Sequence, residues 1–191
     1  MKNRRFIRFA LTACVFFAFN SMMAQGRRSA VESTAGAIQI INRGARSLTL
    51  AFTPKGYSVY SQQVNGEELS SISFSGATYL DEPGKPQIPY YVAILGIPVG
   101  ATVQFEILET DAELVSETKL LPHPSPRKVD GWPEPEFVLD TKTYGSAEPF
   151  PASLVSVQKP AFFREQQIAR IRVAGIQFLP LTSQVKKYNR I

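Results

Sequence analysis

Cysteine and histidine are almost absent from this 191-residue sequence, which holds one of each, Cys14 and His123. A disulfide framework, a zinc site of Cys and His ligands, and a Cys-His or Ser-His-Asp catalytic group all need more of these residues than the chain offers. His123 lies between two prolines with no second His or Cys nearby, so we interpret it as an ordinary loop residue. We expect no metal site, no cofactor and no catalytic residue in this chain.

Other signs of catalysis or nucleotide binding are missing too. The nearest approach to a phosphate-binding loop, Glu82-Pro83-Gly84-Lys85-Pro86, lacks the spacing and the following helix of a true one. The adjacent acids Asp81 and Glu82 are placed for a turn rather than for facing each other across a glycosidic bond. No 12-residue window after the N-terminal region carries the apolar stripe of an amphipathic helix.

The positive charge of the chain lies mainly at its N-terminus. The formal net charge is +5, but four of the 21 basic residues, Lys2, Arg4, Arg5 and Arg8, precede the first apolar run without any acidic neighbour. After residue 24 the sequence has 17 basic and 16 acidic residues. This balance argues against a basic face for nucleic acid, so we expect no nucleic-acid partner.

The N-terminal region has the three parts of a signal peptide, which we predict over residues 1–24. Its apolar stretch, Phe9 to Met23, is about 15 residues long, short of the roughly 20 that a spanning helix needs. Cleavage after Ala24 would leave an exported chain without cysteine or membrane anchor. The alternative is a lipoprotein, because Leu11-Thr12-Ala13-Cys14 has the form of a lipobox.

From Ile38 onward, apolar residues alternate with polar ones, as in strands with one buried face. The alternation is clearest at Leu48–Phe52, Thr102–Leu108 and Ala169–Val173. Further predicted strands are Tyr57–Val64, Ser71–Ser75, Tyr90–Ile97, Glu113–Lys119, Gly175–Leu179 and Val185–Ile191, separated by turn signals such as Asn65-Gly66. We predict an all-β fold, an antiparallel β-sandwich or partly open barrel, over residues 37–191 after a flexible lead-in at residues 25–36. The last strand is expected to leave an exposed edge.

Proline gathers in one part of the chain, where eight of the 14 prolines lie between Pro122 and Pro160. Because proline fixes φ and lacks an N–H, this segment is predicted to form a long surface loop outside the sheets. Aromatic residues recur along it and are expected to pin it to the sandwich: Trp132, Phe137, Tyr144 and Phe150. A flexible Pro-rich linker is the alternative. Within the segment, Pro126-Arg127-Lys128 would expose two cations on a loop whose preceding residues are stiffened by proline.

Several short motifs follow one another in a characteristic order: Phe74-Ser75-Gly76, Gly84-x-Pro86-x-Ile88-Pro89, Ile97-Pro98, the predicted strand Thr102–Leu108, and Leu121-Pro122 with Pro124. In order and spacing they resemble the propeptide of gingipain-type cysteine peptidases, and the likeness covers roughly residues 48–191. It implies a β-sandwich prodomain that acts as intramolecular chaperone and latency inhibitor of a caspase-like peptidase in the same precursor. The cognate peptidase domain would be its partner in cis, with the catalytic Cys and His beyond Ile191.

The resemblance also implies roles for particular residues. In family members specific for basic residues, a cation on a prodomain loop occupies the substrate pocket, and Arg127, with Lys128 as second choice, lies in the matching loop. That inhibitory loop would be supported by Pro122, Pro124, Pro126 and Trp132. Family members commonly leave the cell by type IX secretion, which implies passage through the periplasm to the cell surface or the medium. The alternative function is a free-standing secreted β-sandwich that binds peptide or glycan.

Overall fold

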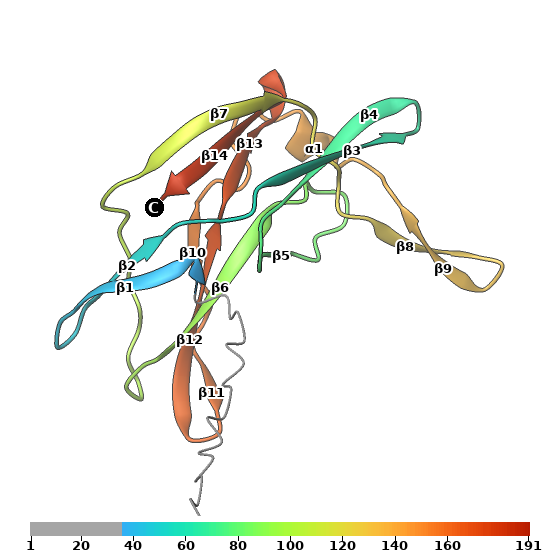
Figure 1. The fold of residues 1–191 in the computed structure, drawn as a ribbon. Helices are drawn as coiled ribbons and strands as arrows, with labels where there is room; N and C mark the ends of the chain where they lie inside the picture. The colour runs from blue at the N-terminus through green and yellow to red at the C-terminus, as the bar shows by residue number, and fades with distance from the viewer. Residues whose placement is uncertain (1–35) are drawn as a thin grey trace, which may run out of the picture. The chain divides into compact units, whose positions relative to one another are not determined.

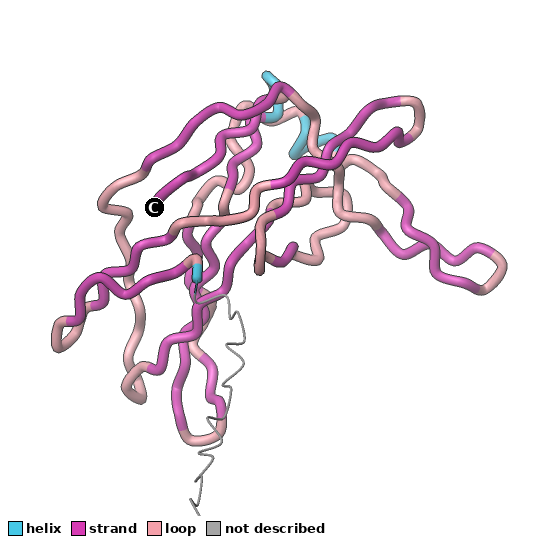
Figure 2. Tube along the Cα trace, viewed as in Figure 1, coloured by secondary structure: helices cyan, strands magenta, loops and turns pink. Residues whose placement is uncertain are grey.

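The computed structural model describes residues 36–191, so the predicted signal peptide and almost all of the predicted lead-in lie outside the described residues. Strands dominate the described part of the chain (Figure 2), and the strand pairs are antiparallel. Helix is limited to short pieces such as α1 (Thr141–Tyr144) and the 3-10 turn η2 (Pro180–Thr182). The prediction of an all-β antiparallel fold is confirmed. In residues 36–191 no helix has both the length and the apolar character needed to cross a membrane.

The larger sheet has five strands in the order β10-β12-β6-β5, with β11 paired to the far end of β12 (Figure 1). Its strands are β5 (Thr78–Tyr79), β6 (Pro89–Gly96), β10 (Val155–Val157), β11 (Ala161–Phe163) and β12 (Gln166–Ala174). The alternation in β12 places Ala169, Ile171 and Val173 in the core, as predicted, while Arg170 faces solvent.

The smaller sheet has the order β13-β14-β7, formed by β7 (Asp111–Glu117), β13 (Ile176–Leu179) and β14 (Gln184–Arg190). The expected exposed edge at the last strand is wrong, since β14 lies between two partners. Ile191 continues this pairing by exchanging two backbone hydrogen bonds with Phe52, of 2.9 and 3.0 Å. Strand β7 and Phe52 come from distant parts of the sequence, which local patterns do not reveal.

The two sheets join where β12 runs into β13 through Gly175. A Cβ atom at Gly175 would lie 2.7 Å from the Phe74 ring, so only glycine fits this close approach. Tyr91 of β6 and Phe178 of β13 are fully buried members of one hydrophobic core to which both sheets contribute. Figure 1 shows the strands of both sheets that supply it. This is the packing of a β-sandwich.

Two further hairpins contribute to the core. They are β1 (Ile38–Arg43) with β2 (Leu48–Phe52), and β3 (Ser58–Val64) with β4 (Glu67–Ser73). The predicted turn Asn65-Gly66 joins β3 to β4, and both residues have positive φ, 52° and 84°. This is the conformation that a two-residue hairpin turn requires.

One predicted strand is absent. Thr102–Leu108 is a loop between β6 and β7, and Phe105 and Leu108 on it are exposed. The alternating pattern suits a strand, but strands also need a neighbour for their backbone groups, and none of the described strands pairs with this segment. The expectation of a strand here was wrong for that reason.

Candidate functional site

The Pro-rich segment contains a hairpin rather than a continuous irregular loop. Its strands, β8 (Ser125–Val129) and β9 (Trp132–Glu136), form a two-stranded sheet of their own (Figure 1). They are joined by Asp130-Gly131, with φ of 50° and 86°. The ribbon accommodates prolines because Pro126 lies directly opposite Pro135. Neither residue has a backbone N–H, so no N–H at this pair is left without an acceptor.

The register of this hairpin places its two cations on opposite faces. Arg127 lies directly opposite Glu134, and Lys128 lies directly opposite Pro133. Residues that face each other across an antiparallel pair share one side of the ribbon, and successive residues alternate between sides. A partner that docks on one face of the hairpin therefore meets only one of the two cations.

Arg127 is the cation with a partner in its own hairpin. Its side chain is 63% exposed, and its Nη1 atom lies 3.4 Å from Oε1 of Glu136. Such surface pairs contribute about 0–1 kcal/mol, so this contact leaves the guanidinium available. Trp132, expected to pin the segment, is 76% exposed beside the turn, so most of its ring faces solvent instead of the sandwich.

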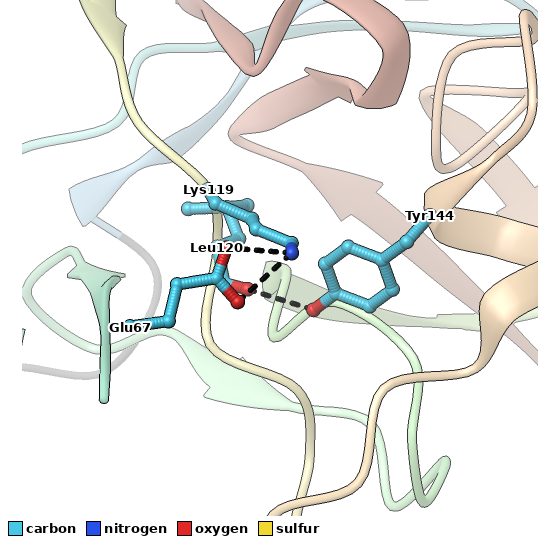
Figure 3. Close-up of polar contacts among 4 residues, drawn as sticks. All are labelled: Glu67, Lys119, Leu120 and Tyr144. Atoms are coloured by element: carbon cyan, nitrogen blue, oxygen red, sulfur yellow. Dashed lines mark hydrogen bonds and ion pairs between the residues drawn. The ribbon is translucent and has the colours of Figure 1, made fainter. Parts of the chain in front are cut away.

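The segment that leads into the hairpin is held by side chains from elsewhere in the fold. The Tyr144 hydroxyl donates a hydrogen bond of 2.7 Å to the buried carbonyl of Leu120 (Figure 3). Beside it, Lys119 Nζ bonds both carboxylate oxygens of Glu67, at 2.8 and 3.0 Å. The Tyr144 ring packs edge-on against Phe178, with centroids 5.7 Å apart. Burial, with the charge of Glu67 as a smaller cause, raises the pKa of Tyr144.

The segment that leaves the hairpin ends at α1, where Asp140 is the N-cap. The Asp140 carboxylate accepts hydrogen bonds from the Thr143 hydroxyl, at 2.6 Å, and from the Lys142 N–H, at 3.3 Å. These bonds, the Thr143 hydroxyl above all, lower the pKa of Asp140. Farther along, Phe150 exchanges two 2.8 Å backbone hydrogen bonds with Phe178. Tyr144 and Phe150 thus attach the segment to the core.

The three prolines that we predicted to support the loop differ in how far they are buried. Pro122 is fully buried, Pro124 is half-buried, and Pro126 is exposed. The support from Glu67, Lys119 and Asp140 was not anticipated. Asp140 is a residue type that favours the N-cap of a helix. The helix that follows it has only four residues, too few to show helical periodicity in the sequence, so the cap was not predicted.

A second feature is an open hollow of about 670 Å³ beside α1, lined by groups of both charges, among them Lys85, Glu148 and Arg172. Burial raises the pKa of Tyr90 in its wall to about 12. Among residues 36–191, no group of three His, Cys, Asp or Glu side chains could hold a metal ion.

Comparisons with known proteins agree on one kind of domain. The family model described as Propeptide_C25 matches residues 33–191. Lys-gingipain from Porphyromonas gingivalis strain ATCC 33277 and Lys-gingipain W83 from Porphyromonas gingivalis are each 23% identical over 176 residues, which are 89% of this chain and 10% of each relative. The chain therefore spans about a tenth of the length of these curated relatives.

Two solved structures share the fold. The complex of Porphyromonas gingivalis RgpB pro- and mature domains contains a chain that matches with a TM-score of 0.72 and 14% identity, covering 81% of this chain and 82% of that one. A structure on the zymogenic latency of gingipain K from Porphyromonas gingivalis matches with a TM-score of 0.65 and 22% identity, covering 80% and 86%.

Proposed function

The chain belongs to the Propeptide_C25 family, and from that membership we propose that it holds a gingipain-type cysteine peptidase latent and assists the folding of that peptidase. The observation that carries the proposal is the family match over residues 33–191, which includes the described sandwich and its hairpin. Of the two similar structures, one is a complex of pro- and mature domains and the other concerns zymogenic latency. A free-standing module for peptide or glycan is not favoured by these matches.

In this proposal, catalysis belongs to a separate peptidase domain of the same precursor, and this chain supplies an inhibitory surface. The β8–β9 hairpin suits that role because it is a narrow ribbon that exposes a cation on each face. Arg127 is the first choice for filling an acidic specificity pocket, since a guanidinium can bond a carboxylate through two parallel N–H groups. Lys128 is the second choice, and it would require the hairpin to dock by its other face.

The ion pair with Glu136 opposes docking of Arg127 only weakly. Leaving Glu136 costs about 0–1 kcal/mol, the range for an exposed ion pair. Truncating one partner of a desolvated charge pair costs about 2–5 kcal/mol. That cost includes the penalty of leaving the pocket carboxylate buried and unpaired, so it is the effect expected of Arg127→Ala and is not the net gain of docking.

We further propose that the precursor is exported through a signal peptide at residues 1–24, reaching the periplasm and then the cell surface or medium by type IX secretion. N-terminal sequencing of the exported precursor, before the propeptide is cut from the peptidase, should give Gln25 as the first residue. A lipid-modified Cys14 at the N-terminus would contradict this route and support the lipoprotein.

The inhibitory role is tested with variants of the chain against the mature peptidase of its precursor. Arg127→Ala should weaken inhibition by about 2–4 kcal/mol, and Arg127→Lys by less, because the ammonium keeps the charge but loses the fork. Lys128→Ala is the matched control and should have a much smaller effect, since Lys128 lies on the other face. A larger effect at Lys128 would show that the other face docks.

The double variant Arg127→Ala, Lys128→Ala tests the hairpin as a whole. If it inhibits as well as the wild-type chain, the hairpin cations have no part in the mechanism. Assistance in folding is tested separately, by refolding the denatured peptidase with and without the chain. The proposal expects a higher yield of active peptidase with the chain, after the inhibitor has been removed.

A further inference from the structure

The loop between β5 and β6 contacts both ends of the segment that carries the hairpin. We name residues 121–123, which lead into β8, the incoming root, and residues 138–140, which follow β9, the outgoing root. The loop itself was singled out in the sequence as the run Gly84-Lys85-Pro86-Gln87-Ile88-Pro89.

Gly84 bonds both roots through its own backbone. Its N–H donates to the carbonyl of His123 in the incoming root, at 2.9 Å. Its carbonyl accepts from the N–H of Asp140 in the outgoing root, also at 2.9 Å. Gly84 alone therefore hydrogen-bonds the incoming root and the outgoing root, the two segments that join the hairpin to the rest of the fold.

The neighbours of Gly84 strengthen the contact with the incoming root. The His123 N–H donates to the carbonyl of Lys85, at 2.7 Å, and the Gln87 N–H donates to the carbonyl of Leu121, at 2.9 Å. The Gln87 side chain adds a bond from Nε2 to the carbonyl of Pro122, at 3.2 Å. The Gly84 motif and the Leu121-Pro122 motif, far apart in the sequence, are therefore hydrogen-bonded to each other at the base of the hairpin.

The position of Gly84 requires glycine for two reasons. Its φ of +82° lies in the left-handed region that side chains disfavour. A Cβ atom there would also lie 3.2 Å from the carbonyl oxygen of Val138 and 3.5 Å from the N atom of Asp140. A side chain at this position would press directly on the outgoing root.

From these contacts we infer that Gly84 is a positioning residue for inhibition: by bonding both roots it fixes the direction of the β8–β9 hairpin and so places the hairpin cation for the peptidase. The inference rests on the proposed function, and it adds a residue outside the hairpin on which inhibition depends. A hinge at the two roots would displace Arg127, which lies halfway along β8, by more than the displacement at the roots themselves.

The experiment compares Gly84→Ala with Gly66→Ala in the full chain. Gly66 is the matched control because its φ is +84° but a Cβ there meets nothing within 4 Å, so it reproduces the backbone strain without pressure on a root. Gly84→Ala should raise the inhibition constant against the mature peptidase by about 10- to 100-fold, the scale of a misplaced contact group. Gly66→Ala should leave it nearly unchanged. Equal constants for the two variants would overturn the inference.

A second measurement separates positioning from general loss of structure. Amide hydrogen exchange in Gly84→Ala should become faster at residues 125–136 and remain as in wild type in β12. In the background Arg127→Ala, Lys128→Ala, the substitution Gly84→Ala should weaken inhibition no further, since there is no cation left to place. An undiminished effect in that background would overturn the inference.

If Gly84→Ala does not fold, Gln87→Ala replaces it; this variant removes only the side-chain bond to Pro122, and it should give a smaller change in the same direction in inhibition and in exchange at residues 125–136. If the wild-type chain fails to inhibit, the proposed function fails. Exchange then still tests whether Gly84 holds the hairpin, and unchanged exchange would refute that as well.

Discussion

Tyr144→Phe tests how the segment leading into the hairpin is held. The variant removes only the hydroxyl that donates 2.7 Å to the carbonyl of Leu120, and it keeps the ring that packs against Phe178. Leu120 is fully buried, and the Tyr144 hydroxyl is the one hydrogen-bond partner of its carbonyl oxygen within residues 36–191. The change therefore leaves a buried acceptor without a partner.

The expected loss of stability follows from that acceptor. An unsatisfied buried polar group costs about 1–3 kcal/mol, more than the net value of an average hydrogen bond. With a urea m-value of about 2 kcal/mol/M, a loss of about 2 kcal/mol lowers the unfolding midpoint by about 1 M. The m-value itself should not change, because the surface exposed on unfolding is nearly the same.

The assay is equilibrium urea unfolding followed by far-UV circular dichroism. Tyr60→Phe is the control, because Tyr60 on β3 is 62% exposed, and its change in free energy of unfolding should stay within about 0.5 kcal/mol. If Tyr144→Phe shifts the midpoint no more than Tyr60→Phe does, the hydroxyl does not hold the segment and the reasoning is refuted.

Three further predictions concern other parts of the fold. Gly175→Ala should destabilise the chain by about 1–3 kcal/mol in the same unfolding assay, because its Cβ would lie 2.7 Å from the Phe74 ring; a neutral change would contradict the tight corner. The pKa of Asp140 is held below its ordinary value of 3.8, so its contribution to stability is present above about pH 4 and is lost as pH falls through the folded-state pKa. Thr143→Val should raise that pKa toward 3.8 in a carboxyl ¹³C NMR titration, and an unchanged pKa would show that the hydroxyl is not its cause. Trp132, the one tryptophan of the chain and 76% exposed, should be strongly quenched by acrylamide in the free chain, whereas a protected ring would contradict its place at the hairpin turn.

The parts of the fold that sequence predicts well are local. The alternation in β12 follows from side-chain direction along one strand, and the Asn65-Gly66 turn from the φ angles that two residues adopt. Whether Thr102–Leu108 forms a strand, and whether β14 is central in its sheet, depends on which distant strand lies alongside. No local pattern contains that information.

The candidate site shows the same division. Sequence reasoning located the exposed cations at Arg127 and Lys128, since charge and proline are visible in the printed sequence. It missed the hairpin because it took proline as excluding strands, although a two-stranded ribbon accommodates proline opposite proline. It also missed the bonds of Gly84 to the two roots, because these join residues that are far apart in sequence.

The most direct test of the central proposal is a titration of the mature peptidase with this chain. The peptidase that we propose to follow this chain in its precursor is held at fixed concentration, and its hydrolysis of a peptide substrate is followed as the purified chain is added. Activity should fall in proportion to added chain and be abolished near one chain per peptidase. Undiminished activity with the folded chain in large excess would contradict it.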